Sequence, residues 1–197
     1  MIRAEYEMHE FSTLPLFDGA GGSDLRGSQP LPPEAKIDWN YFFEIPGLTP
    51  PDDPNLARLI DTKLSLPLSN LPPTVVAHVD GAILALAQRN LLRGKRLGLP
   101  AGQDVARAMG AAPIPNERLG LTDAGWGGKA PLWYYVLKEA ELLGGRQLGP
   151  VGRRVVAEVI LGLLALDPTS YFNVRGGWAP AIAPFEMGDL LRLAGAA

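Results

Sequence analysis

The chain has 197 residues, of which 47% are hydrophobic and 20% charged, and its formal net charge is -3. This composition is ordinary for a folded globular domain and excludes a disordered acidic or basic tail. The acidic balance argues against bulk attraction to nucleic acid or to an anionic membrane. Cysteine is absent, which excludes disulfides, thiolate catalysis and Cys-ligated zinc or iron–sulfur sites, and His9 and His78 are the two histidines.

The sequence shows no segment that would direct the chain into a membrane. Its first residues, 1–7, are charged and lack the apolar region of a signal peptide. The longest apolar run, 155–166, contains Glu158 and is shorter than the roughly 20 residues of a membrane span. We therefore expect a soluble, cytoplasmic chain with no membrane partner.

Glycine and proline set the organisation of the first third. The 23 Gly and 19 Pro amount to about twice the usual share, and residues 1–74 hold Gly- or Pro-rich stretches at 18–23, 29–33 and 46–51. Such stretches cannot continue a helix, and no strand with clear alternation is expected in the chain. The aromatic segment 37–43 predicts a short helix capped by Asp38 that anchors these loops.

From residue 75 onward the periodicity of apolar residues becomes helical. The pattern predicts five helices, at about 75–94, 102–109, 131–143, 150–166 and 186–194. Thr74 is the expected N-cap of the first, Gly94 lies near its end, Gly144 and Gly145 end the third, and Asp167 with Pro168 ends the fourth. The prediction is a mainly α-helical single domain over 1–197, with a coil-rich wrap over 1–74 and a helical part over 75–197. So long a wrap favours a piece of a larger domain.

The most informative element is the predicted helix 75–94. One narrow stripe, spaced by four and three residues, contains Val79, Ile83, Leu86, Asn90, Arg93 and Leu97. A second apolar face makes this helix largely enclosed, so Asn90 is expected to be buried and to need hydrogen-bond partners. Its amide either satisfies backbone carbonyls of a neighbouring loop or orients an imidazole or a ligand group.

Four cations gather at the end of the same helix: Arg89, Arg93, Lys95 and Arg96. Cations at a helix C-terminus complement the helix dipole and need no ligand. Alternatively, an arginine here binds a carboxylate or phosphate in bidentate fashion. A nucleic-acid patch is a third interpretation, which the net charge and the lack of flanking basic stretches disfavour.

Several segments together resemble the animal-type haem peroxidases of the peroxidase–cyclooxygenase superfamily, and their bacterial members in particular. In chain order these segments are 24–27, 37–39, 86–100, 102–108, 131–140, 148–158 and 167–171, followed by Trp178. The resemblance implies that Asn90, in an Arg-Asn-Leu-Leu-Arg motif, hydrogen-bonds the ring nitrogen of the proximal, iron-ligating histidine. It also implies that Arg93 binds a haem propionate and that Leu86 contacts the cofactor.

The resemblance covers only the C-terminal part of the family domain. The distal histidine and arginine that cleave peroxide would lie upstream, and the proximal histidine would fall just before Met1. His9 and His78 match neither ligand position and are expected to be surface or packing residues, so no residue of the chain is assigned as a metal ligand. A truncated domain would expose apolar surface on helix 75–94, which predicts association with a complementary N-terminal segment or with a second copy.

Other motifs give no competing activity. Residues 127–130, Gly-Gly-Lys-Ala, lack the leading glycine and the Ser/Thr of a phosphate-binding loop, and residues 19–24 lack the third glycine of a dinucleotide fingerprint. Glu158 is expected to pair with Arg154 four residues earlier rather than to handle protons.

Two functions from different classes remain. The first is a C-terminal segment of a haem-dependent peroxidase, for which the resemblance implies oxidation by hydrogen peroxide, although the chain alone is not expected to turn over. The second is a non-catalytic helical interaction module. Haem binding through Asn90 and Arg93 discriminates between them.

Overall fold

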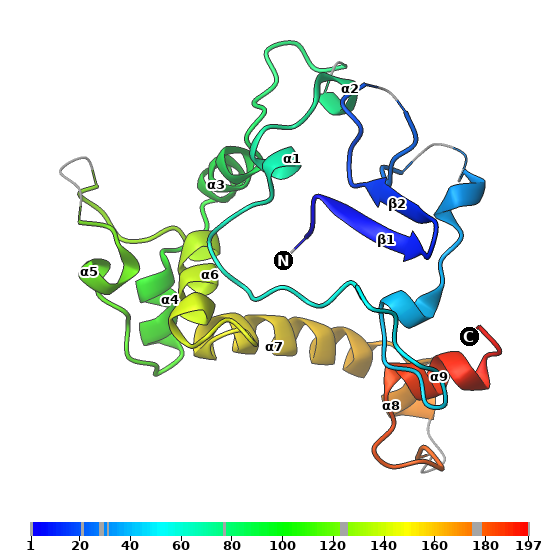
Figure 1. Cartoon of the computed structure of the whole chain (residues 1–197). Helices are drawn as coiled ribbons and strands as arrows, with labels where there is room; N and C mark the ends of the chain where they lie inside the picture. Colours follow the sequence, from blue (N-terminus) through cyan, green and yellow to red (C-terminus); the bar gives the residue numbers. More distant parts are fainter. Residues whose placement is uncertain are drawn as a thin grey trace. The chain divides into compact units, whose positions relative to one another are not determined.

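The computed structural model of the chain (Figure 1) describes residues 2–20, 22–27, 30, 32–76, 78–122, 126–174 and 179–196. These residues are mainly helical, with one small two-stranded sheet, so the predicted helical class is confirmed. Trp178, which contributes to the resemblance, lies outside the described residues, as does Ala77 of the predicted helix 75–94.

The chain divides into two compact units. The first comprises Leu59–Leu64 and Ala85–Gly177, and the second comprises Ile2–Arg58, Ser65–Leu84 and Trp178–Ala197. The single-domain organisation expected from the sequence stays a prediction.

The first unit is helical in every element that the structure describes. Its helices are α3 (Leu86–Arg96), α4 (Gly102–Ala108), α5 (Asn116–Leu119), α6 (Leu132–Leu142), α7 (Pro150–Leu166) and α8 (Tyr171–Val174). Its core consists of Ala106, Leu119, Ala130, Tyr135 and Val151, all without exposed surface. These residues come from α4, α5, α6, the first turn of α7 and the segment before α6, so the core lies where these four helices meet (Figure 1).

Tyr135 is the largest side chain of this core. Its hydroxyl accepts a hydrogen bond from the backbone N–H of Ile114 at 3.0 Å, which satisfies both groups. Its ring lies against Gly102, where a Cβ atom would overlap it. The glycine at the start of α4 is therefore required by the close approach of α4 and α6.

Glu139 links α6 to the start of α7. Glu139 is 4% exposed, and its carboxylate accepts hydrogen bonds from the backbone N–H groups of Val151, at 3.0 Å, and Gly152, at 3.3 Å. Both amides belong to the first turn of α7, where no intrahelical acceptor exists, so a side chain of a different helix caps α7. Gly149 leaves the room for this carboxylate, since a Cβ atom there would overlap it.

The second unit combines the small sheet with short helices. Its elements are β1 (Glu5–His9), β2 (Ser12–Pro15), two 3-10 helices η1 (Pro33–Ala35) and η2 (Trp39–Tyr41), and α1 (Leu66–Ser69), α2 (Pro73–Val76) and α9 (Met187–Leu193). Its buried apolar side chains are Met8, Leu14, Ile45, Leu68, Leu71, Val76 and Leu191. The expected cap at η2 is confirmed, because the Asp38 carboxylate accepts a hydrogen bond from the Asn40 N–H at 2.9 Å.

The antiparallel pair β1–β2 forms although the sequence shows no strand with clear alternation. Tyr6 pairs with Leu14 and Glu7 with Thr13, and a bulge follows between Glu7 and His9. Met8, Ser12 and Leu14 point inward and are buried, so the alternation of buried and exposed residues in the two strands rests on three positions. A pattern this short is visible only once the two strands pair.

The prediction of one helix over 75–94 is wrong. Helix α2 ends at Val76, residues 78–85 form turns and extended chain, and α3 begins at Leu86. Gly81 adopts a left-handed conformation with φ of 64°, which interrupts any helix through this region. Thr74 lies inside α2 and does not cap it, and the residue in the left-handed conformation after α3 is Gly98 rather than Gly94.

The four later helices are confirmed to within about one residue. Helices α4, α6, α7 and α9 occupy the predicted ranges, Gly144 and Gly145 follow α6 with positive φ, and Asp167 ends α7. The sequence analysis missed the single-turn helices α1, α5 and α8. In the described part of the chain, no helix has both the length and the apolar run that crossing a bilayer would require.

Candidate functional site

Helix α3 carries the residues that the sequence analysis assigned to a site. Its first turn, Leu-Ala-Gln-Arg, consists of good helix formers, and it ends at Leu97, whose N–H donates to the Arg93 carbonyl at 2.9 Å. None of its residues is buried. An eleven-residue helix without a buried side chain contributes little to the core, so its polar side chains are not needed for packing.

Asn90 is half-buried, so its predicted full burial is wrong. The prediction relied on a second apolar face that included Val76 and Leu84, but these residues are not part of α3. Within the described residues, the Asn90 amide forms no hydrogen bond. It is therefore available to a group that the chain does not itself supply there.

The structure places Leu86, Asn90 and Arg93 on one face of α3, at successive spacings of four and three residues. Leu86 is half-buried, Arg93 is exposed, and Leu97, which continues the face, is 68% exposed. Val79 and Ile83 belong to the region before α3, so the long stripe that the sequence predicted is reduced to its last four members.

The cations of α3 have no acidic partner among the described residues. Arg89, Arg93, Lys95 and Arg96 take part in none of the ion pairs there. Three of the four lie in the last turn, where they complement the helix dipole. Their charge remains available to an anion, since no carboxylate neutralises it.

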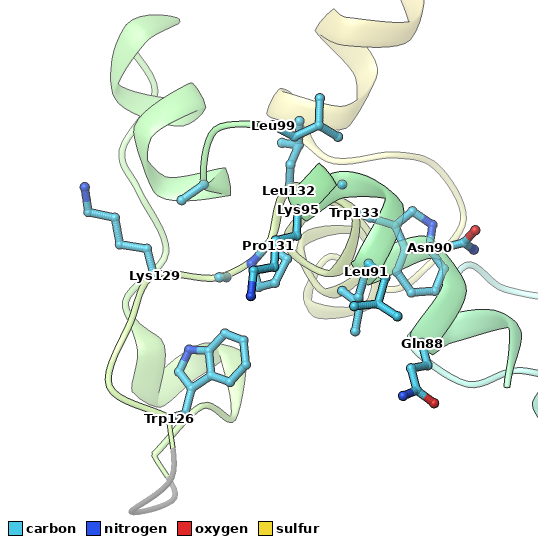
Figure 2. A pocket seen from close by; sticks show the side chains of 14 residues that line it. Gln88, Asn90, Leu91, Lys95, Leu99, Trp126, Lys129, Pro131, Leu132 and Trp133 are labelled. Carbon is cyan, nitrogen blue, oxygen red and sulfur yellow. The ribbon is translucent and has the colours of Figure 1, made fainter. Parts of the chain in front are cut away.

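A cavity of about 570 Å³ lies on the other side of α3 (Figure 2). Its lining includes Leu91, Lys95, Trp126, Lys129 and Trp133, from α3, α6 and the segment before α6. Of the three predicted site residues only Asn90 reaches this lining, and Figure 2 shows its amide directed away from Trp126 and Lys129. The structure therefore separates the predicted face of α3 from the cavity.

The segment from Trp126 to Pro131, which lines one side of the cavity, is anchored to α4 by polar contacts. The Ala130 N–H donates to the buried Gln103 amide oxygen at 2.9 Å. The Lys129 ammonium lies 2.6 Å from the Asp104 carboxylate, and this hydrogen bond lowers the pKa of Asp104 below its ordinary value. Lys129 is thus already paired, which leaves Lys95 as the unpaired cation of the lining.

This cavity was not predicted from the sequence. Residues 127–130 resemble only an incomplete phosphate-binding loop, whereas in the structure they join Trp126 to α6. The available signal was a pair of tryptophans, Trp126 and Trp133, on either side of a glycine-containing segment.

The residues on α3 and around the cavity suit some parts of the implied haem and not others. Unpaired cations on α3 suit carboxylates, and the apolar walls with two indole rings suit a flat, largely apolar ring. No side chain of the lining is a histidine, cysteine, methionine or tyrosine, and the described residues contain no group of three or more His, Cys, Asp or Glu side chains placed to hold a metal ion. The residues thus fit the carboxylates of haem and do not fit its iron, so no step through the iron is derived.

The two histidines do not alter this result. His9 lies in β1 of the second unit, where its Nδ1 accepts a hydrogen bond from the Phe11 N–H at 3.3 Å. His78 is exposed and belongs to the same unit. Both positions agree with the surface or packing roles expected from the sequence.

The exposed polar groups of α3 are solvated by water and remain available to a ligand. The chemistry available on α3 is one amide that can accept or donate a hydrogen bond and several cations that can hold carboxylates. Comparisons of the chain with family models, curated proteins and solved structures find no match.

Proposed function

We propose that the chain is the C-terminal segment of a haem-dependent peroxidase and that α3 supplies groups of its proximal side. The observation that carries the proposal is the set of polar side chains on α3 without partners among the described residues, Asn90 and Arg93 foremost. The resemblance of the motif around Asn90 to the animal-type haem peroxidases adds the identity of the ligand.

In this proposal each residue of the face has one task. The Asn90 side-chain oxygen accepts a hydrogen bond from the ring N–H of a histidine that another segment supplies, which fixes the tautomer of that histidine. The Arg93 guanidinium binds a propionate through two parallel hydrogen bonds, and Leu86 contacts the ring edge. Haem, when bound, supplies the oxidation of donors by hydrogen peroxide, and the chain alone is not expected to catalyse it.

Titration of the purified chain with haemin, followed by the Soret absorption, tests this proposal. We expect a saturable shift at one equivalent. Replacing Asn90→Ala and Arg93→Ala together should weaken binding about tenfold or more, because losing a hydrogen bond to a charged group costs roughly 1.5–3 kcal/mol. The matched control Arg96→Ala removes a cation of the same helix off the face and should change the affinity by less than about twofold.

Other outcomes of the titration are equally informative. A spectrum identical to that of free haemin would refute the proposal. A loss of binding in Lys95→Ala, with the double variant unaffected, would place the ligand in the cavity instead of on the face of Asn90.

A second function, a non-catalytic interaction module, is favoured by a different observation. The second half of α7 exposes a series of large aliphatic side chains, among them Val159, Ile160 and Leu163, all more than half exposed. Patches of this kind mark protein–protein contact surfaces. Association that persists when haemin does not bind would select this function.

A further inference from the structure

The second half of α7 carries an apolar stripe that the first unit leaves uncovered. The α7 stripe consists of Val156, Val159, Ile160, Leu163 and Leu164, which are 44, 57, 52, 65 and 37% exposed. The first turn of the same helix is packed, since Val151 and Gly152 are buried. Figure 1 shows the rest of α7 extending beyond α4 and α6.

The spacing of the stripe is that of a helix-pairing surface. Its members stand at i, i+3, i+4, i+7 and i+8, which places these five in an arc of about 140°. Leu161 and Leu166, which are 50 and 83% exposed, lie beyond the two edges of this arc. Glu158 is the one charged residue between 155 and 166, and it lies on the opposite side. There it pairs with Arg154 at 2.6 Å, as the sequence predicted. Within the five positions of the stripe a partner therefore meets no charge.

The size of the surface approaches what a stable dimer needs. The stripe offers on the order of 500 Å² of apolar surface, near the upper limit for the largest patch of an ordinary monomer. Helix α8 follows α7 and exposes Tyr171, Phe172 and Val174 at 54, 43 and 63%. Together the two helices come close to the roughly 800 Å² that each partner contributes to a typical stable interface.

Ile160 is the central residue of the stripe, with Val156 and Leu164 at equal distances before and after it. Reversing the direction of α7 around this residue places Val156 opposite Leu164 and Ile160 opposite its own copy. A short side chain then faces a long one, and no like charges meet. Such self-complementarity is what a two-fold symmetric interface requires.

We propose that a second copy of this chain covers the α7 stripe, through antiparallel pairing of the two α7 helices around a two-fold axis at Ile160. The inference rests on the interaction-module function and requires no cofactor. The Arg154–Glu158 pairs remain on the outside of the helix pair, and α8 of each copy extends the contact.

Sedimentation equilibrium of the full chain over a range of concentrations tests the pairing. We expect a dimer for the natural sequence and a monomer with unchanged helical circular dichroism for Ile160→Glu, because two carboxylates would meet at the axis. The matched control Leu161→Glu places the same charge at a 50% exposed position about 60° beyond the edge of the stripe at Leu164 and should remain dimeric. A dimer that survives Ile160→Glu would overturn the inference.

A covalent test gives an independent readout, because the chain contains no cysteine. Single-cysteine variants Ile160→Cys and Leu161→Cys are oxidised and separated under non-reducing conditions. A disulfide-linked dimer is expected from Ile160→Cys alone, since only that position meets its own copy.

The remaining outcomes separate the candidate occupants of the stripe. A natural chain that stays monomeric and unlinked overturns the inference. If, in addition, Ile160→Glu lowers the stability of that monomer, another part of the same chain covers the stripe. A failed haemin titration with an intact dimer refutes the haem proposal and leaves the pairing in place.

Discussion

The cap that Glu139 provides for α7 gives the sharpest test of how the first unit is held together. In Glu139→Ala the two backbone N–H groups of Val151 and Gly152 lose their acceptor in a place that water does not reach. Each buried donor left without a partner costs about 1–3 kcal/mol, so the variant should lose roughly 2–6 kcal/mol of unfolding free energy. Glu139→Gln keeps one acceptor oxygen in the same position and should lose only about 1 kcal/mol.

The pH dependence separates the cap from a simple packing effect. Burial raises the pKa of Glu139, and its hydrogen bonds from Gly152 and Val151 and the nearby Arg153 charge offset this only in part. The folded chain holds the Glu139 proton more tightly than the unfolded chain. Proton binding by Glu139 therefore contributes to the free energy of unfolding, and this contribution is fully present below the ordinary pKa of a glutamate. It is lost as the pH rises through the raised pKa, and Glu139→Gln should lack this decline.

Urea unfolding followed by tryptophan fluorescence and circular dichroism provides the measurement, repeated across the acidic and neutral range. Two results would refute the reasoning. One is a Glu139→Ala variant within about 0.5 kcal/mol of the natural chain. The other is a Glu139→Gln variant as unstable as the alanine variant.

Three further predictions concern the same unit. Gly102→Ala should cost about 1–3 kcal/mol of stability, because its Cβ overlaps the buried ring of Tyr135. Gly162→Ala, which meets open space on α7, should gain about 0.5–1 kcal/mol. Equal effects of the two substitutions in thermal unfolding would contradict both. Tyr135→Phe leaves the Ile114 N–H without its acceptor and should lose about 1–3 kcal/mol, measured by urea unfolding; an unchanged midpoint would show that the bond is dispensable. Arg154→Ala removes an exposed ion pair and should change stability by no more than about 0.5 kcal/mol, with the difference vanishing in high salt; a large, salt-independent loss would point to its packing instead.

The helices of the first unit were predictable because local signals agreed with one another. Helix α6 has an apolar face and is followed by Gly144 and Gly145, and α7 begins with a proline and ends at Asp167. In such segments periodicity, start and stop point to the same boundaries. The predicted helix 75–94 failed because Val79 and Ile83 fit the helical period by spacing alone, while the left-handed turn at Gly81 divides the segment.

The candidate site was predictable only as a pattern on one helix. The sequence places Leu86, Asn90 and Arg93 on one face, and the structure retains that face. Whether Asn90 is buried depends on which distant residues pack against α3, and no local rule contains that information. The cavity depends in the same way on the meeting of Leu91 with Trp126, residues from segments that are far apart along the chain.

The lack of buried residues in α3 has a consequence for how the protein moves. A helix with no buried residue can unwind while α4, α6 and α7 stay folded, so its amides should exchange with deuterium through local opening. The amides of α6 around Tyr135 should exchange only when the whole unit unfolds. Anything that binds α3 then slows exchange there first, and the protection pattern along α3 would map the footprint of the ligand.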